Sequence, residues 1–308
     1  MGFEDADLIL GLMLAYGMGI PESHEEAASH YLRAAGKGRA LACRELGTMY
    51  SKGKGVPQSP AESLRWYREG AEAGDVDSQM FLGNAYEEGK GVPVSYEDAL
   101  HWYRKASDGG SGWCKGEIGY MYEHGLGVEQ SYEEAFKWYV DGARAGSAWS
   151  QFKAGYALEK GKGAPVSLTE AAGWYHKAAS QGDAGAQCSL GMMYQKGSGV
   201  PKYHPEAVRL YRMAADQGSP WGQRLLADMY EHGLGVEQSY EEAFNLYMMS
   251  AEKGDKWAGF KLGTFFEEGK GTSQSYGEAA KWYIASAEKG VVSAQRSIGR
   301  LYGRGLGV

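Results

Sequence analysis

The pattern of apolar, small and polar positions repeats along the chain with a step of 36 residues. The stretch MYEHGLGVEQSYEEAF occupies residues 121–136 and recurs without change at residues 229–244, which is 108 residues or three steps later. The step runs from end to end without an insertion or a deletion. A fixed period of this length is typical of solenoids, in which each repeat packs on its neighbours. The pattern therefore predicts a single solenoid over residues 1–308, and such arrays bind more often than they catalyse.

Each repeat is predicted to contain two helices joined by a glycine-rich turn. The first helix ends at two glycines that lie two residues apart, because glycine adopts positive φ without steric cost. These pairs are Gly17/Gly19, Gly53/Gly55, Gly89/Gly91, Gly125/Gly127, Gly161/Gly163, Gly197/Gly199, Gly233/Gly235, Gly269/Gly271 and Gly305/Gly307. A phosphate-binding loop is the alternative, but no strand is predicted before these turns and no P-loop lysine accompanies them.

Serines mark the start of most second helices. They are Ser23, Ser59, Ser95, Ser131, Ser167, Ser239 and Ser275, each followed three residues later by an acidic residue. This spacing predicts capping boxes, in which the serine oxygen accepts from an amide of the first turn and the carboxylate accepts from the cap's own amide. One copy has Tyr203 in place of serine and Pro205 just inside the helix, where proline is tolerated. We expect these acidic residues to be structural.

Small and large side chains share fixed places in the second helix. Alanine takes one place in seven repeats and Ser63 in the eighth, and eight tyrosines from Tyr31 to Tyr283 take another. Alanine permits close helix approach and the ring fills the gap, so these residues are predicted to form the core. The tryptophans expected in the same core are Trp66, Trp102, Trp138, Trp174 and Trp282.

The predicted fold is all-α, with nine first helices and eight second helices in a solenoid of 36-residue helix-turn-helix repeats. The last first helix, residues 291–302, has no following helix to cover its apolar side, which predicts end-to-end self-association.

Composition and charge narrow the classes of partner. The chain has 43% hydrophobic residues, enough for a core, and its formal net charge of −7 disfavours nucleic acid. Cys43, Cys114 and Cys188 fall in different repeats and are expected to be free core residues. The apolar run at residues 8–16 follows acidic residues and is in register with later first helices, so we interpret it as a helix and not as a secretory signal. No stretch reaches transmembrane length. The expected compartment is the cytoplasm, or the periplasm if a leader was removed.

The repeat resembles the Sel1-like repeat. The residues that carry the resemblance are Leu46, Gly47, Tyr50, Gly53, Gly55 and Val56, followed by the pattern A-x-x-W-Y and a closing A-x-x-G. The related tetratricopeptide repeat has 34 residues, so the step of 36 and the glycine-rich turn favour the Sel1-like repeat. Departures are Leu210 and Leu246 in place of tryptophan, Leu158 in place of tyrosine and Ala227 in place of glycine.

This resemblance implies a right-handed α/α superhelix whose first helices line a concave groove that binds proteins. Sel1-like proteins include adaptors in endoplasmic-reticulum quality control, bacterial signalling and host-interaction factors, and immunity proteins that neutralise secreted lipase effectors. Cysteine-rich bacterial relatives have penicillin-binding-type activity, which is not carried over because this chain lacks their cysteine pairs. The expected function is a non-enzymatic scaffold for a partner protein, in its narrower form an inhibitor of a secreted effector enzyme. The alternatives are an adaptor in a quality-control or signalling complex and a hydrolase.

One place at the start of the first helix is unusually aromatic, with Trp113, Trp149, Trp221 and Trp257 in four of its nine copies. The same helical face continues with Glu117, Tyr120 and His124, with Tyr156, and with Asp228 and His232. Glu123, Glu159, Glu231 and Glu267 lie nearby as an expected acidic rim. Aromatic enrichment is typical of interfaces, so these residues are predicted to contact the partner. The alternative is that the tryptophans pack on the preceding repeat.

The pairs Glu123-His124 and Glu231-His232 suggest catalysis or metal binding, because histidine titrates near neutrality and binds metals. They lie three repeats apart, too far to share one ion. No nucleophile or metal-ligand spacing accompanies them. We therefore expect no catalytic residue, no metal and no cofactor.

Overall fold

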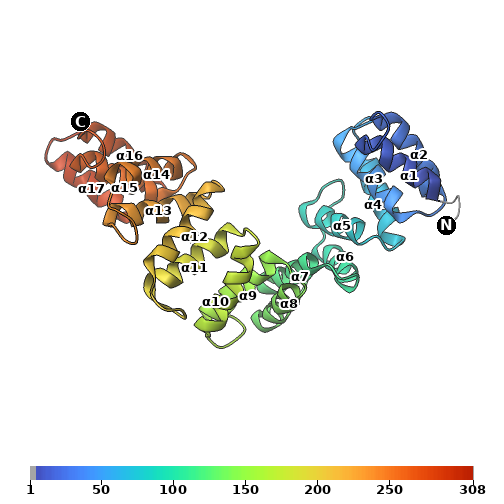
Figure 1. The fold of residues 1–308 in the computed structure, drawn as a ribbon, viewed down its shortest axis with the longest axis horizontal. Helices are drawn as coiled ribbons and strands as arrows, with labels where there is room; N and C mark the ends of the chain where they lie inside the picture. The colour runs from blue at the N-terminus through green and yellow to red at the C-terminus, as the bar shows by residue number, and fades with distance from the viewer. Residues whose placement is uncertain (1–4, 308) are drawn as a thin grey trace. The chain divides into compact units, whose positions relative to one another are not determined.

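The computed structural model describes residues 5–307, and the regular elements among them are all α-helices. In chain order they are α1 (Ala6–Tyr16), α2 (His24–Gly36), α3 (Ala40–Lys52), α4 (Pro60–Glu72), α5 (Val76–Glu88), α6 (Tyr96–Asp108), α7 (Gly112–His124), α8 (Tyr132–Arg144), α9 (Ala148–Lys160), α10 (Leu168–Ser180), α11 (Ala184–Lys196), α12 (His204–Asp216), α13 (Pro220–His232), α14 (Tyr240–Glu252), α15 (Lys256–Glu268), α16 (Tyr276–Glu288) and α17 (Val292–Gly303) (Figure 1). The odd-numbered helices are the predicted first helices and the even-numbered ones are the second helices. The predicted all-α fold of helix hairpins is confirmed.

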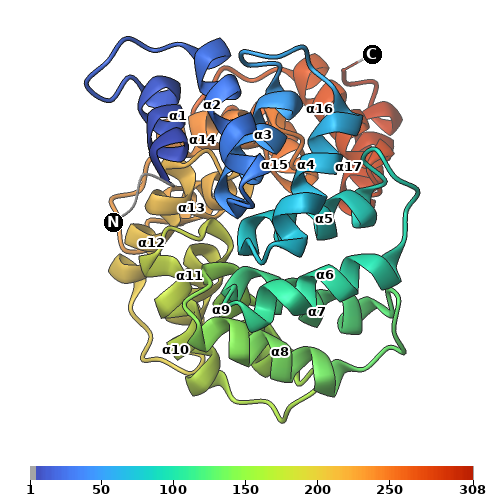
Figure 2. The same cartoon turned by 90° about the vertical axis from the view of Figure 1, so that its right-hand side faces the viewer.

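Contacts between residues divide the chain into two compact units, each described by itself. Unit 1 contains Met1–Ser150 and Lys162–Ala164, and unit 2 contains Gln151–Gly161 and Pro165–Val308. Within each unit, consecutive helices pack against one another. The loops that connect each first helix to its second helix project beyond the ends of the helices (Figure 2). A single solenoid over the whole chain stays a prediction.

The helix ends follow the predicted signals. First helices end at glycines with positive φ, such as Gly53 at 66° and Gly125 at 67°. Six of the seven cap serines accept the amide three residues later, at 3.2–3.4 Å. The seventh, Ser167, instead donates its hydroxyl to Glu170 at 3.1 Å. Each repeat therefore starts and stops its helices as local chemistry requires.

The second half of the predicted capping box is wrong. The amide of the cap serine donates to a carbonyl of its own first helix, nine residues earlier, as from Ser59 to Tyr50 at 3.0 Å and from Ser131 to Tyr122 at 2.9 Å. Because this amide is already satisfied, the acidic residue is free for other bonds; Asp98, for example, accepts from the Ser95 hydroxyl at 2.6 Å. The bond from cap to carbonyl ties each turn to its hairpin.

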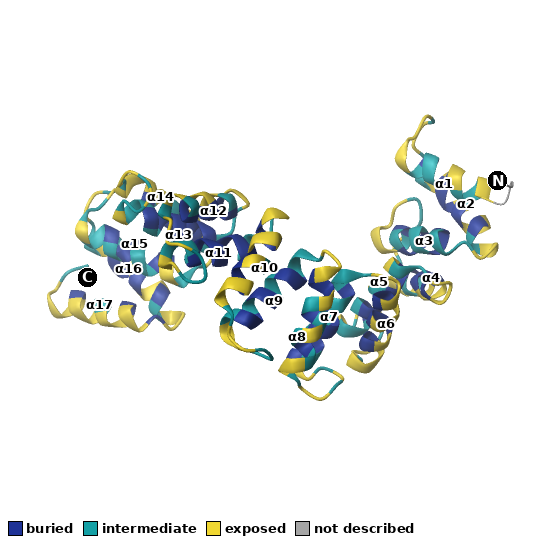
Figure 3. Cartoon of the chain, turned by 60° about the horizontal axis from the view of Figure 1, so that its bottom comes forward, coloured by how far each residue is buried: buried dark blue, intermediate teal, exposed yellow. Residues whose placement is uncertain are grey.

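The core of each hairpin is built around the second-helix tyrosine. Tyr103 and Tyr247 are 0% exposed, and buried faces lie between neighbouring helices (Figure 3). A Cβ added at Gly47 would lie 2.7 Å from the Tyr67 ring, and one at Gly119 would lie 2.8 Å from the Tyr139 ring. The close approach of the ring explains the glycine of the Leu-Gly pair at these positions, and α13, with Ala227 at this place, is an exception.

The prediction that five second-helix tryptophans are core holds for two of them. Trp66 and Trp102 are buried, whereas the three at positions 138, 174 and 282 are only half-buried. These indoles lie near the hairpin surface, where long side chains cover them; Lys177 Nζ, for example, is 4.3 Å from the centre of the Trp174 ring. The prediction for the three cysteines is confirmed, because all are buried and free.

The outer surface of α17 is exposed along much of its length (Figure 3). Val292 is 57% and Tyr302 is 46% exposed. Self-association through this surface stays a prediction.

Candidate functional site

The candidate site lies on one side of the first helices. Helix α7 presents Trp113, Glu117, Tyr120, Glu123 and His124 there. We call these five places, and their equivalents at steps of 36 residues in the other first helices, the first-helix face. Four of these places vary widely from repeat to repeat, unlike the glycines and tyrosines that build the hairpins, whereas the place of Glu123 is glutamate in five repeats.

The hydroxyl groups of the core tyrosines end on the first-helix face. Tyr139 donates to Glu123 at 2.6 Å, and Tyr175 donates to Glu159 at 2.8 Å. The equivalent acceptors in other hairpins are Glu87, Gln195, Glu231 and Glu267, always sixteen residues before the tyrosine. Burial, and then the carboxylate partner, raise the pKa of Tyr139, so its hydroxyl stays a donor at neutral pH.

This tyrosine–carboxylate pairing was missed in the sequence. The acceptor and the tyrosine both follow the step of 36, so their fixed separation was a usable signal. The pairing shows that Glu123 and Glu231 have a structural part in addition to any contact with a partner.

The expected acidic rim is largely balanced by cations. Lys162 lies 3.6 Å from Glu123, and Lys261 lies 2.8 Å from Glu231. Glu159 and Glu267 are paired with Lys160 at 2.5 Å and with Arg300 at 2.7 Å. The rim therefore does not present an uncompensated negative charge to a basic partner.

Unit 1 brings several candidate residues together as an aromatic cluster, which we define as Tyr120, His124 and Trp149. The rings of Tyr120 and His124 are 4.0 Å apart between centroids, and those of Tyr120 and Trp149 are 6.3 Å apart. His124 Nδ1 lies 2.9 Å from the Tyr120 carbonyl oxygen, which fixes the imidazole over its own helix.

Trp149 packs directly on helix α7, because Gly116 has no side chain at the point of contact. A Cβ at Gly116 would lie 2.6 Å from the Trp149 indole, and the same indole meets the Tyr139 ring edge-on at 5.9 Å. Trp149 is half-buried, so it packs on the preceding hairpin and still presents part of its ring. Trp113 also packs edge-on against a core tyrosine, with its ring centroid 5.9 Å from that of Tyr103, and Glu117, four residues later, is half-buried.

Unit 2 holds its candidates differently. Trp221 is half-buried in a core cluster, whereas Trp257 is 48% exposed. Tyr156 is half-buried, with Lys160 Nζ 5.8 Å from its ring centre. His232 is exposed, and its Nδ1 lies 2.8 Å from the Asp228 carbonyl oxygen.

Asp228 and Glu231 both accept from Tyr247, each at 2.6 Å. Burial raises the pKa of Asp228, although Tyr247 and nearby cations oppose this effect. For Glu231, burial is outweighed by the hydrogen bonds from Lys261 and Tyr247, and its pKa is lowered. This side of unit 2 is thus a polar network, in contrast to the aromatic cluster of unit 1.

Within residues 5–307, no group of three or more His, Cys, Asp or Glu side chains is arranged to hold a metal ion. Over the same residues, none of the helices has the length and apolar character needed to cross a membrane.

A family model of the Sel1 repeat matches residues 5–38, 40–75, 76–111, 117–147, 150–183, 184–219, 222–255 and 258–291. The chain belongs to the Sel1 repeat family. The resemblance noted in the sequence is confirmed, and the departures Ala227, Leu210 and Leu246 lie inside matched repeats.

Two solved structures share the fold with TM-scores above 0.7. A protective antigen present in uropathogenic Escherichia coli strains, c5321, is 34% identical, with a TM-score of 0.74 over 100% of this chain and 73% of that chain. A Sel1 repeat protein from Oxalobacter formigenes is 26% identical, with a TM-score of 0.71 over 97% of this chain and 86% of the other. An immunity protein from Pseudomonas aeruginosa is 19% identical, with a TM-score of 0.43 over 69% of this chain and 81% of that chain. No protein with curated annotation matches the sequence.

Proposed function

We propose that this Sel1 repeat protein is a non-enzymatic scaffold that binds a partner protein through its first-helix face. The observation that supports this most is the aromatic cluster of Tyr120, His124 and Trp149, whose rings pack against one another. The three residues occupy helical positions that vary between repeats. Rigid aromatic side chains in a partly exposed cluster are typical anchors of protein interfaces.

The proposed contact residues are Trp113, Glu117, Tyr120, Glu123, His124 and Trp149 in unit 1, and Tyr156, Trp221, Asp228, His232 and Trp257 in unit 2. Glu123, Glu231 and Asp228 already bond to core tyrosines. We therefore expect the aromatic residues to contribute most of the binding energy and the carboxylates to contribute mainly to the orientation of the bound partner.

The test is a substitution that removes one ring of the cluster. We expect Tyr120→Ala to weaken partner binding by about 2 kcal/mol or more, because hot-spot aromatic residues have this magnitude. The matched control is Met192→Ala, which shortens the side chain at the equivalent place of α11, where Lys196 stands in place of His124. Calorimetric titration with a partner isolated by pull-down measures both, and circular dichroism checks the fold. Equal affinity of the Tyr120→Ala variant and the wild type would contradict the proposal.

In its narrower form the proposal is that the partner is a secreted effector enzyme, inhibited by occlusion. The support for this form is the resemblance to Sel1-like immunity proteins. A tight equimolar complex that blocks a hydrolase would support it. Hydrolysis of an ester or a lactam by the purified chain would instead favour an enzyme.

A further inference from the structure

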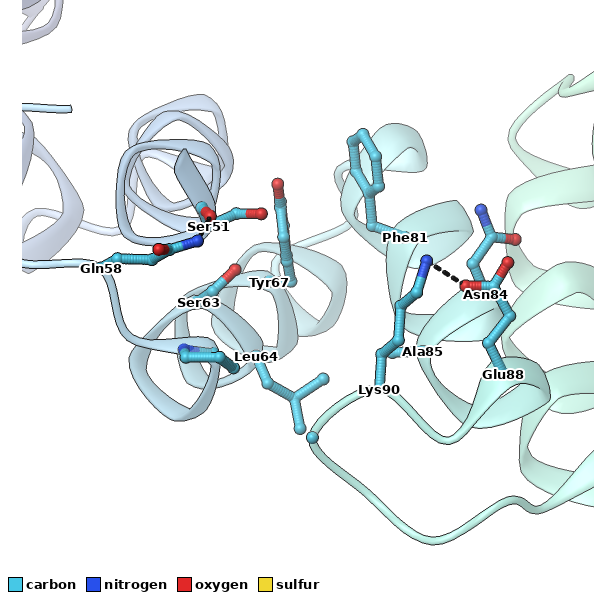
Figure 4. A pocket seen from close by; sticks show the side chains of 12 residues that line it. Ser51, Gln58, Ser63, Leu64, Tyr67, Phe81, Asn84, Ala85, Glu88 and Lys90 are labelled. Atoms are coloured by element: carbon cyan, nitrogen blue, oxygen red, sulfur yellow. Dashed lines mark hydrogen bonds and ion pairs between the residues drawn. The ribbon is translucent and has the colours of Figure 1, made fainter. Parts of the chain in front are cut away.

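A cavity of about 580 Å³ lies in unit 1 between hairpin α3–α4 and helix α5. Leu64 and Tyr67 line one side, and Phe81, Ala85 and Lys90 line the other (Figure 4). Its size falls within the roughly 300–1,000 Å³ range of ligand pockets. Other lining residues are Ser51, Asn84 and Glu88, which belong to the first-helix face of α3 and α5, so the cavity opens where the partner is proposed to bind.

The same place three repeats later, in unit 2, is almost filled. A cavity of about 150 Å³ is lined there by Glu159, Leu168, Ser189, Met192, Met193, Lys196 and Ser198, each 108 residues after a residue that lines the larger cavity. Leu168 stands in place of Pro60, and Met193 stands in place of Ala85. The small side chains of Pro60 and Ala85 therefore contribute to the larger cavity.

Two other repeats have a tyrosine ring at the place of Pro60, next to a lysine. The equivalents of Pro60 are Tyr132 and Tyr240, and each of their rings lies beneath a lysine of the following turn. Lys162 Nζ is 5.2 Å from the centre of the Tyr132 ring, and Lys270 Nζ is 5.4 Å from that of Tyr240. These are cation–π distances.

Lys90 is the equivalent of Lys162 and Lys270, but it has no such ring below it because Pro60 has no aromatic side chain. Lys90 pairs with Glu88, as Lys270 pairs with Glu268 at 2.6 Å. The ammonium is thus held by the equivalent glutamate, as in the repeat that contains Tyr240, while the phenol ring is missing.

The backbone is also more open at this position. A Cβ added at Gly163 or Gly271 would lie only 1.9 or 2.2 Å from the carbonyl oxygen of Tyr132 or Tyr240. At Gly91 the corresponding distance to the Pro60 carbonyl oxygen is 3.7 Å. The turn after α5 therefore stands away from the start of α4, which widens the entrance.

We propose that this cavity is a recognition pocket for a tyrosine side chain of the protein partner. The phenol ring takes the place that Tyr240 occupies in its own repeat, between Leu64 and Ala85 and beneath the Lys90 ammonium. Gln58, the lining residue equivalent to the Gln238 that donates to the Tyr240 hydroxyl at 3.1 Å, offers the same donor to the incoming hydroxyl. The inference rests on the proposed function, because it assigns the chemistry of one contact of that partner.

The first experiment uses N-acetyl-tyrosinamide as a probe and methyl NMR of the full chain. We expect intermolecular NOEs from the probe ring to the Leu64 and Ala85 methyl groups. The Pro60→Tyr variant restores the chain's own ring, so the probe should bind at least ten-fold more weakly. The matched control Leu168→Tyr makes the same change at the small cavity and should leave probe binding unchanged. Absence of these NOEs, or equal binding by Pro60→Tyr, would overturn the inference.

Lys90→Met tests the cation–π contact. This substitution should weaken the binding of N-acetyl-tyrosinamide several-fold and leave the binding of N-acetyl-leucinamide unchanged, since only an aromatic ring interacts with the ammonium in this way. An equal loss for both probes would overturn the assignment of a tyrosine.

The second experiment separates the pocket from the proposed function. With an isolated partner, we expect Pro60→Tyr to weaken binding at least ten-fold. Binding that is lost in Tyr120→Ala and unchanged in Pro60→Tyr would overturn the pocket and leave the proposed function standing. Binding that is unchanged in Tyr120→Ala and weakened in Pro60→Tyr would support the pocket and remove the aromatic cluster from the interface.

Discussion

Hairpins α7–α8 and α13–α14 contain the same sixteen-residue segment, in unit 1 and unit 2 respectively, and its internal contacts are the same in both. His124 Nδ1 and His232 Nδ1 lie 2.9 and 2.8 Å from the carbonyl oxygen four residues earlier. Gln130 and Gln238 both donate at 2.8 Å to the carbonyl seven residues earlier. Identical local sequence therefore gives identical local structure.

The tryptophan that follows each segment behaves differently in the two units. Trp149 packs on α7 over Gly116, whereas Trp257 is 48% exposed. The residue equivalent to Gly116 is Arg224, whose guanidinium bonds to Asp255 at 3.1 Å. A residue five positions before the shared segment thus decides whether the next tryptophan packs or stays in solvent. Surface character depends on these variable residues, and the repeated residues give only the framework.

The largest expected effect is the loss of Trp149. We expect Trp149→Ala to lower the free energy of unfolding by about 3 kcal/mol, because it removes an indole packed on Gly116 and Tyr139. The equivalent Trp257→Ala should cost less than about 0.5 kcal/mol, as exposed substitutions do. Urea denaturation of both variants measures the difference. Equal losses would contradict the claim that Gly116 and Arg224 set the two environments apart.

A smaller effect is expected two residues before the shared segment, where Gly119 in α7 corresponds to Ala227 in α13. A Cβ at Gly119 would lie 2.8 Å from the Tyr139 ring and 3.0 Å from the Ala135 carbonyl oxygen. We expect Gly119→Ala to cost about 2 kcal/mol through overpacking. The reciprocal Ala227→Gly should cost about 1 kcal/mol, chiefly through helix propensity. Thermal unfolding checks both, and a neutral or stabilising Gly119→Ala would show that the tyrosine ring has room to move.

Most of the fold was predictable from sequence because it depends on local signals that recur. Glycines with positive φ end the first helices and serines cap the second ones, as expected. The partner of the cap amide was not predictable from spacing alone, since the Tyr122 carbonyl that accepts it belongs to another helix. Contacts across a turn require the hairpin geometry.

The candidate site was predictable only in part, for the same reason. The aromatic place in the first helix was visible, but whether Trp149 and Trp257 pack depends on Gly116 and Arg224 in the preceding repeat. The effect of Pro60 likewise became visible only when its cavity was compared with those of other repeats. Such effects come from pairs of repeats and not from one repeat read alone.

The smallest expected effect concerns a charge that differs between hairpins. The Tyr247 hydroxyl has one proton but lies 2.6 Å from both Asp228 and Glu231. In α5 the equivalent of Asp228 is Asn84, which accepts from Tyr103 at 2.6 Å without carrying a charge. Unit 2 therefore has two carboxylates at a place where unit 1 has one.

Asp228→Asn should consequently stabilise the chain at pH 7, by less than about 1 kcal/mol, the usual size for a substitution outside the apolar core. Burial raises the pKa of Asp228 above its ordinary value of 3.8, so the folded state binds the proton more tightly than the unfolded state does. The free energy of unfolding of the wild type then falls as pH rises through the interval above 3.8, while the asparagine variant lacks this loss. The advantage of Asp228→Asn should shrink as pH is lowered towards 4. Urea denaturation at several pH values measures it, with the exposed Asp216→Asn as control. A destabilised variant at pH 7 would mean that the cations around Asp228 outweigh its burial, and that the polar network of unit 2 is held together by its charges.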